Sequence, residues 1–479
     1  FFTPTPASAI RLSLVGSEMC IRDRDNTAPT ISAVTQVVTP SNDTTPSYVF
    51  TTGEAGTITT NITEGFSTSA SAANGNNTVT FNTLGAGTYA DKTITLTDAA
   101  GNTSSLTLVT FVIDTTAPTA AITYNSVSPY KNGDTVTITA TFNGPVLDSP
   151  VPTIAIAGSG IANVASTNMT KTSTTVYTYS YAVPTGDGTG TVTVGTAQDA
   201  AGNVVTSTPT SGATFTVDNT APTGAITYSA DAPYKQNATA TVTATFTEAL
   251  TTTPKIAISG VSTVAATNMT STGSANVWTY AYTAPAGNGT DTFAFSVGTD
   301  AAGNTVTAAP TSGATVTVDN TAPSLTAVTQ VVTPSNDTTP SYVFTTGEAG
   351  TITTNITEGF STSSSAATGS NQTITFNTLG AGTYADKTIT VTDAAGNASS
   401  LTLTTFVIDT TVPTGALTYS ADGPYKENAT ATVTATFTEA LTTTPKIAIS
   451  GVSSVAATNM TSTGSANVWT YAYTAPAGN

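Results

Sequence analysis

Acidic residues recur at fixed places in this chain, which otherwise carries few charges. They begin two short motifs, Asp-x-Thr-x-Pro and Asp-Ala-Ala-Gly-Asn, and each motif occurs several times. Ca²⁺ takes about six to eight oxygen ligands, chiefly carboxylates and carbonyls, whereas carboxylates grouped without a cation repel one another. The motifs therefore raise divalent-cation binding as the first chemistry to consider. The first motif starts at Asp25, Asp114, Asp218, Asp319 and Asp409, and the second at Asp98, Asp199, Asp300 and Asp393.

The positions of the motifs fit a repeated β-sandwich. The motif at Asp98 follows an expected strand, 93–97, and precedes the expected last strand, 105–113. Because the last strand runs away from this loop to the far end of its domain, Asp98 is expected at the entrance end, near Asp25. In a seven-strand sandwich the loop after the second strand lies at the same end, and here that loop contains Glu54. We therefore expect Asp25, Glu54 and Asp98 to converge as calcium ligands.

The same argument gives equivalent sets of carboxylates further along the chain. The set that begins at Asp114 departs from the pattern, because Gly144 stands where a glutamate aligns, and Asp148 is the candidate substitute. The set that begins at Asp409 has no third member within the sequence. The further sets are Asp218, Glu248 and Asp300; Asp319, Glu348 and Asp393; Asp114 and Asp199; and Asp409 and Glu439.

Turn formation is an alternative explanation of both motifs. Gly and Asn adopt positive φ readily, and an Asp side chain can accept hydrogen bonds from the backbone of its own turn. The segment Asp-Ala-Ala-Gly-Asn is suited to such a turn, and the Asp of each linker can close one as well. At the level of sequence, cation binding and turn formation both remain open.

Long internal repeats set the domain organisation. Residues 33–69 recur unchanged at 327–363, and residues 237–288 recur at 428–479 with one change. Repeats of this size indicate an array whose units fold separately. We predict two A units, two complete B units and a final B unit that ends before its last strands. The boundaries are 25–113 (A), 114–217 (B), 218–318 (B), 319–408 (A) and 409–479 (B), referred to below as units 1 to 5.

Strand patterns dominate the chain. Residues 135–142 alternate strictly between Thr and apolar side chains, which predicts a strand with one buried face. Aromatic residues alternate with small ones at 177–181 and 278–282, a pattern expected of a sandwich core. Lys235 and Lys426 each follow a Tyr in a polar stretch that suits a solvated side chain. The predicted fold class is all-β: a tandem array of immunoglobulin-like sandwiches forming an extended, monomeric rod.

A family resemblance follows from these segments. The Asp-Thr-Thr-Ala-Pro-Thr linkers, the Thr-Gly-Glu-Ala-Gly loop around Glu54 and the Asp-Ala-Ala-Gly-Asn loops resemble bacterial Ig-like repeats of large surface adhesins. Residues 136–146 resemble a second variety of repeat from the same class of protein. The resemblance covers residues 25–479. It implies display on the cell surface or secretion, and structural calcium at the junctions between domains.

The first 24 residues do not resemble any unit. Leu14 to Arg24 resembles the translation of a transposase-based sequencing adapter, which points to a metagenomic assembly. Cys20 and every Arg of the chain lie in residues 1–24, so we assign them no function. We interpret residues 25–479 as a fragment of a longer protein, and residues 1–24 as an artefactual, disordered leader.

Composition excludes several classes of function. The chain has no His, and without the leader no Cys, so the usual catalytic triads and zinc sites cannot form. A net charge of −17 opposes binding to nucleic acid, because nothing would neutralise phosphate groups. Apolar runs are too short to span a membrane. The chain is therefore expected to be non-catalytic, with no nucleic-acid partner and no membrane insertion.

Three functions remain to be compared. The first is the structural extender of a bacterial adhesin, whose host or surface ligand binds regions outside the fragment. The second is an accessory region of a large secreted enzyme. The third is a glycan- or protein-binding module, but the loops lack the aromatic and Arg anchors typical of such sites.

Overall fold

The structure is a computed structural model and describes residues 24–366 and 371–478. Within these residues it contains strands and loops and no helix, as predicted. It follows that the described part of the chain has no helix capable of crossing a membrane. Most of the adapter-like segment, including Cys20, lies outside the described residues.

The A units each contain two main sheets and one short two-stranded sheet. In unit 1 the sheets have the orders β1-β2-β5, β4-β3-β7-β8 and β6-β9, and unit 4 repeats this arrangement. The strands of unit 1 are β1 (Ile31–Thr35), β2 (Ser47–Thr52), β3 (Gly56–Thr60), β4 (Ser71–Ala72), β5 (Gly75–Thr80), β6 (Gly87–Tyr89), β7 (Thr93–Thr97), β8 (Thr103–Thr107) and β9 (Phe111–Ile113). Those of unit 4 are β26 (Leu325–Thr329), β27 (Ser341–Thr346), β28 (Gly350–Thr354), β29 (Ser365–Ala366), β30 (Asn371–Thr375), β31 (Gly382–Tyr384), β32 (Thr388–Thr392), β33 (Ala398–Thr402) and β34 (Phe406–Ile408).

The complete B units each contain two four-stranded sheets, with orders β10-β11-β15-β14 and β13-β12-β16-β17 in unit 2. The strands of unit 2 are β10 (Ala120–Tyr124), β11 (Thr135–Phe142), β12 (Thr153–Ser159), β13 (Val164–Asn168), β14 (Thr170–Lys171), β15 (Val176–Ala182), β16 (Gly188–Gly195) and β17 (Thr214–Val217). Those of unit 3 are β18 (Gly224–Tyr228), β19 (Thr239–Phe246), β20 (Pro254–Gly260), β21 (Val264–Asn268), β22 (Thr270–Ser271), β23 (Val277–Thr283), β24 (Gly289–Val297) and β25 (Thr315–Val318).

Unit 5 lacks counterparts of β24 and β25 in its described residues. Its second sheet is therefore only the pair β37-β38. Leu417 is 50% exposed, whereas the corresponding Ile226 of unit 3 is 3% exposed. Tyr419 is 57% exposed, whereas the corresponding Tyr228 packs partly buried against the core of unit 3. The strands of unit 5 are β35 (Gly415–Tyr419), β36 (Thr430–Phe437), β37 (Lys446–Ile449), β38 (Val455–Asn459), β39 (Thr461–Ser462) and β40 (Val468–Thr474).

One predicted strand is wrong in detail. The segment expected as a single last strand, 105–113, is divided into β8 and β9. β8 pairs with β7, and β9 pairs with β6 in another sheet. Between them, Leu108 is buried and its amide donates to the Lys92 carbonyl oxygen, so the chain crosses from one sheet to the other at this point.

The interior of each sandwich comes from the alternating strands. In β11 the apolar residues are buried and all four threonines are half-buried or exposed, which confirms the predicted pattern. Tyr177, Tyr181 and Tyr282 are at most 3% exposed, and Trp278 is 9% exposed. These aromatic side chains therefore belong to the cores and do not form a surface platform. Each of the five units has a separate cluster of buried apolar residues.

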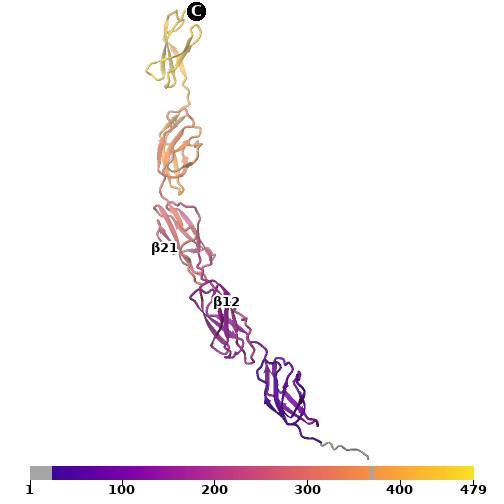
Figure 1. Cartoon of the computed structure of the whole chain (residues 1–479). Coiled ribbons are helices and arrows are strands. Elements are labelled where there is room, and N and C mark those ends of the chain that lie inside the picture. Colours follow the sequence, from indigo (N-terminus) through magenta and orange to yellow (C-terminus); the bar gives the residue numbers. More distant parts are fainter. Residues whose placement is uncertain (1–23, 367–370, 479) are drawn as a thin grey trace, which may run out of the picture.

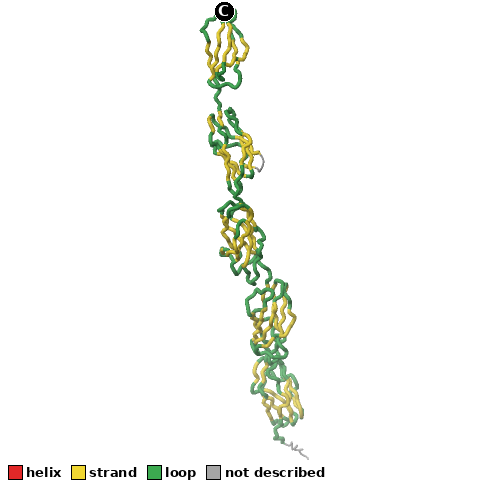
Figure 2. The backbone as a smooth tube through the Cα atoms, turned by 90° about the vertical axis from the view of Figure 1, so that its left-hand side faces the viewer, coloured by secondary structure: helices red, strands yellow, loops and turns green. Residues whose placement is uncertain are grey.

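The units follow one another end to end in a long rod. Figure 1 shows the sequence colours changing in order along the rod, from indigo near the N-terminus to yellow at the C-terminus. The perpendicular view in Figure 2 shows the same elongated shape, with loops gathered where consecutive units meet. Residues that act on the relative position of two units must therefore lie in these loops and linkers.

Candidate metal centres at the unit junctions

At the junctions among units 1 to 4, the aspartate that begins the linker is hydrogen bonded by both neighbouring units. The Asp218 amide donates to the Tyr130 carbonyl oxygen of unit 2 at 2.8 Å. The Asp218 carbonyl oxygen accepts from Asn304 Nδ2 of unit 3 at 2.9 Å. Asp319 has the same two kinds of partner, from Tyr234 at 2.9 Å and from Asn397 at 3.0 Å. The linker aspartate is thus fixed at the boundary of the two units.

The loop Asp-Ala-Ala-Gly-Asn is a closed turn held by its own aspartate. Asp98 Oδ1 accepts from the amides of Ala100 and Asn102, and Asn102 Nδ2 donates to Asp98 Oδ2 at 2.9 Å. These hydrogen bonds, led by the one from the Asn102 side chain, lower the pKa of Asp98 because they favour the charged carboxylate. Asn102 also donates to the Asp25 carbonyl oxygen at 3.1 Å. Turn formation, the alternative open from sequence, therefore applies to this loop.

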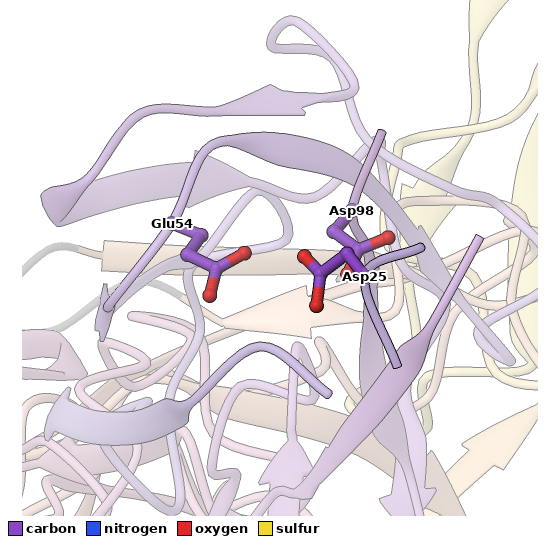
Figure 3. Close-up of side chains that lie close together, drawn as sticks. All are labelled: Asp25, Glu54 and Asp98. Carbon is purple, nitrogen blue, oxygen red and sulfur yellow. The ribbon is translucent and has the colours of Figure 1, made fainter. Parts of the chain in front are cut away.

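The predicted carboxylates of unit 1 lie together. Asp25 comes from the linker, Glu54 from the loop between β2 and β3, and Asp98 from the loop between β7 and β8. Each offers one oxygen within 4.8 Å of the others, and Figure 3 shows the carboxylates of Asp25 and Glu54 directed into the same space beside Asp98. The topology argument thus placed these three residues at the correct end of the sandwich.

Two further units repeat this triad, with oxygens again within 4.8 Å: Asp218, Glu248 and Asp300 in unit 3, and Asp319, Glu348 and Asp393 in unit 4. The pKa of Glu248 is raised, first by burial and then by the negative charges of Asp218, Asp300 and Asp187. The pKa of Glu348 is raised by burial and by Asp319 and Asp393. Both shifts have the causes expected of carboxylates forced together.

The donor chemistry of the triads fits a hard divalent cation. Every candidate ligand is oxygen, which suits Ca²⁺ and not the soft transition metals. In unit 1, the described hydrogen bonds to Asp25 reach Oδ1 and the main chain. They leave Asp25 Oδ2 and the Glu54 carboxylate available for a cation. A bound cation would replace the mutual repulsion of the three charges with attraction.

Units 2 and 5 do not form a triad among their described residues. Asp114 and Asp199 line one pocket with Gly144, so this site has two carboxylates where units 1, 3 and 4 have three. Asp148 does not substitute, because its carboxylate forms an ion pair with Lys171 at 2.5 Å. This corrects the alternative considered from sequence. In unit 5, Asp409 and Glu439 have no third carboxylate beside them in the described chain.

The sequence argument missed a set of junction contacts. Lys131 Nζ of unit 2 donates to the Gly303 carbonyl oxygen of unit 3 at 2.6 Å. Lys235 Nζ of unit 3 donates to the Gly396 carbonyl oxygen of unit 4 at 3.0 Å. Lys235 is exposed, as expected, but its ammonium group also contacts the next unit. The signal was available in the sequence, since each B unit has a Tyr-Lys pair at the same position.

Comparisons with known proteins give only distant likenesses to solved structures. No family model and no curated protein matches the chain. A structure of titin domains has 12% identity and a TM-score of 0.25, covering 61% of this chain and 99% of its own. Fibronectin(III)-like modules of Clostridium thermocellum CbhA have 16% identity and a TM-score of 0.20, covering 42% and 93%. Domains 4–9 of the surface layer protein SbsC have 13% identity and a TM-score of 0.18, covering 92% and 75%. Likeness at this level says nothing about what the present chain binds.

Proposed function

We propose that this chain is the extender region of a bacterial surface-displayed or secreted adhesin, in which Ca²⁺ at the junctions stiffens the rod. The observation that carries the proposal is the position of Asp218. Its main chain is bound by units 2 and 3, and its carboxylate meets two carboxylates of unit 3. A cation held there ties the linker to the following unit.

The cation acts through the linker and not through either core. Unit 3 has its own cluster of buried apolar residues, which contains none of the triad carboxylates. The junction, in contrast, brings three negative charges together, and their repulsion favours separation of the linker from the unit. Binding of Ca²⁺ reverses this preference, which reduces bending between neighbouring units.

The same features support a location outside the cell and a non-enzymatic role. Repeated sandwiches that form a rod place a terminal region at a distance from its anchor, which suits display outside the cell. The described triads repeat at equivalent junctions, and a catalytic pair has no reason to recur in this way. An accessory region of a secreted enzyme is the second candidate, and it predicts the same junction chemistry.

A calcium titration of the full chain tests the proposal. After treatment with a chelator, calorimetry is expected to detect binding at the three complete triads. The variant with Glu54→Gln, Glu248→Gln and Glu348→Gln loses this binding. The matched control changes three glutamates outside the triads, Glu64→Gln, Glu358→Gln and Glu427→Gln, and keeps it. Equal binding by the two variants would contradict the proposed sites.

A further inference from the structure

The two lysines that cross a junction occupy equivalent places and reach equivalent acceptors. Lys131 and Lys235 directly follow the tyrosines that hold the linker, and each binds a glycine carbonyl oxygen in the next unit. Gly303 and Gly396 are the same residue of the Asp-Ala-Ala-Gly-Asn loop. One receiving unit is of type B and the other of type A, so the contact does not depend on the type of the receiving unit.

The backbone that carries Lys131 is fixed relative to the linker. Tyr130 forms an isolated parallel bridge with Val217, and its amide donates to the Thr216 carbonyl oxygen at 2.9 Å. The Tyr130 hydroxyl donates to the Ser126 carbonyl oxygen at 2.7 Å, and the Lys131 amide donates to Asp134 Oδ2 at 3.0 Å. Only the side chain of Lys131 is left to adjust, so its ammonium group is directed towards the next unit from a defined origin.

The acceptor loop is also fixed, and glycine is needed in it. Gly303 and Gly396 have φ values of 85° and 89°, which L side chains rarely adopt. A Cβ on Gly303 would lie 3.3 Å from Lys131 Nζ, and one on Gly396 would lie 3.4 Å from Lys235 Nζ. The glycine therefore supplies both the conformation of the turn and the room for the ammonium group.

The A unit uses a different donor at the corresponding position. Ser41 of unit 1 makes the parallel bridge to Ile113 that Tyr130 makes to Val217, so Asn42 corresponds to Lys131. The Asn42 amide donates to the Ala201 carbonyl oxygen, in the same loop of unit 2, at 3.0 Å. The loop thus receives a lysine side chain from a B unit and a main-chain amide from an A unit.

We propose that Lys131 and Lys235 are positioning residues, which hold the next unit in a fixed orientation through its Asp-Ala-Ala-Gly-Asn loop without a metal ion. This lysine contact is distinct from the calcium sites, because the acceptor is a main-chain carbonyl oxygen and the donor is an ammonium group of the chain itself. The type of the preceding unit then determines how a junction is held, while the receiving loop stays the same.

Distances between spin labels across the junction of units 2 and 3 test this proposal in the full chain. Labels are attached to Thr191→Cys and Thr292→Cys, two exposed strand positions, with Cys20→Ser removing the only other thiol of the sequence. Distance distributions are measured by pulsed electron paramagnetic resonance, in chelator and in calcium. Lys131→Met removes the donor, and Lys426→Met is the matched control, since it follows Tyr425 but has no following loop of this kind within the sequence.

We expect Lys131→Met to broaden the distribution in chelator and Lys426→Met to leave it unchanged. Loss of one hydrogen bond to a charged donor should raise the population of undocked orientations roughly tenfold or more. Unchanged melting of unit 3, followed by Trp278 fluorescence, shows that the unit itself is intact. Equal distributions for the two variants in chelator would overturn the proposal. A wild-type distribution that does not respond to calcium would instead contradict the calcium sites alone.

Discussion

Asn304 Nδ2 lies 2.9 Å from Asp300 Oδ2 and 2.9 Å from the Asp218 carbonyl oxygen, so one amide group joins the turn of unit 3 to its linker. The equivalent asparagines of units 1, 2 and 4 make the same pair of contacts. The last residue of the Asp-Ala-Ala-Gly-Asn motif therefore has a structural role whether or not a cation is bound.

Asn304→Ala is expected to destabilise unit 3 by about 1–3 kcal/mol, because two partly buried acceptors lose a donor. The chain has only two tryptophans, Trp278 in unit 3 and Trp469 in unit 5. In a Trp469→Phe background, urea unfolding followed by fluorescence reports unit 3 alone. The exposed Asn268→Ala is the control and should have little effect. A loss below about 0.5 kcal/mol for Asn304→Ala, the usual range of surface changes, would show that the amide is not needed.

Glu248→Gln is expected to change stability in opposite directions with and without calcium. In chelator at neutral pH it removes a charge that the neighbouring carboxylates oppose, so the melting temperature of unit 3 rises. In excess calcium it removes a ligand, and the stabilisation by binding, about 2.7 kcal/mol at a hundredfold excess over Kd, is reduced. Thermal unfolding by Trp278 fluorescence measures both. A change of the same sign in both conditions would argue against a cation at this triad.

The pH dependence of unit 3 follows from the raised pKa of Glu248. A carboxyl group with a raised pKa in the folded state binds its proton more tightly there, so its contribution to stability is present in acid and is lost as pH rises through the folded pKa. In chelator, wild-type unit 3 should lose this contribution between the ordinary pKa of Glu and the raised one. Glu248→Gln should not show this step when melting is followed across the same range.

The buried Asp291 of unit 3 allows core packing to be compared between the two complete B units. Asp291 is fully buried and accepts from the Tyr282 hydroxyl at 2.8 Å and from the Ser262 amide at 2.6 Å. Its cross-strand partner is Val316, whereas the equivalent pair in unit 2 is Gly190 and Phe215.

Asp291→Gly is therefore expected to cost about 2–3 kcal/mol, because it leaves the buried Tyr282 hydroxyl without its acceptor. Adding Val316→Phe should recover part of the loss by filling the space above the glycine, as Phe215 does in unit 2. Unfolding followed by Trp278 fluorescence measures the stability of each variant in the double-mutant cycle. Strictly additive effects of the two changes would contradict this account of the pair.

The exposed apolar side chains of unit 5 predict that added strands will stabilise this unit. Leu417, Tyr419 and Ile447 line a pocket on this face, where unit 3 places β24 beside β20. A copy of residues 289–318 appended after Asn479 should bury these side chains and raise the melting temperature of unit 5, read from Trp469 in a Trp278→Phe background. The same thirty residues in scrambled order form the control, and an equal rise with both would show that specific strand pairing is not responsible.

The sequence predicted the sandwich fold, the strand at 135–142 and the convergence of Asp25, Glu54 and Asp98. The strand follows from alternation within a short segment, and the convergence follows from the topology of a whole domain. The prediction failed where contacts formed in the folded chain decide between alternative local structures. The division of 105–113 into two strands depends on the burial of Leu108, and Asp148 is held by Lys171, which is distant in sequence. The lysine contacts depend on the relative placement of two units, which the Tyr-Lys pair of each B unit does not specify by itself.

The most direct test of the calcium-stiffened rod is the distance distribution between spin labels in units 2 and 3. The labels are attached to Thr191→Cys and Thr292→Cys in the chain that carries Cys20→Ser and no other change. We predict that millimolar calcium narrows the distribution relative to chelator, and that Glu248→Gln prevents most of this narrowing. Identical distributions in calcium and in chelator would contradict the account, and would leave the acidic loops as turns in a rod held by hydrogen bonds alone.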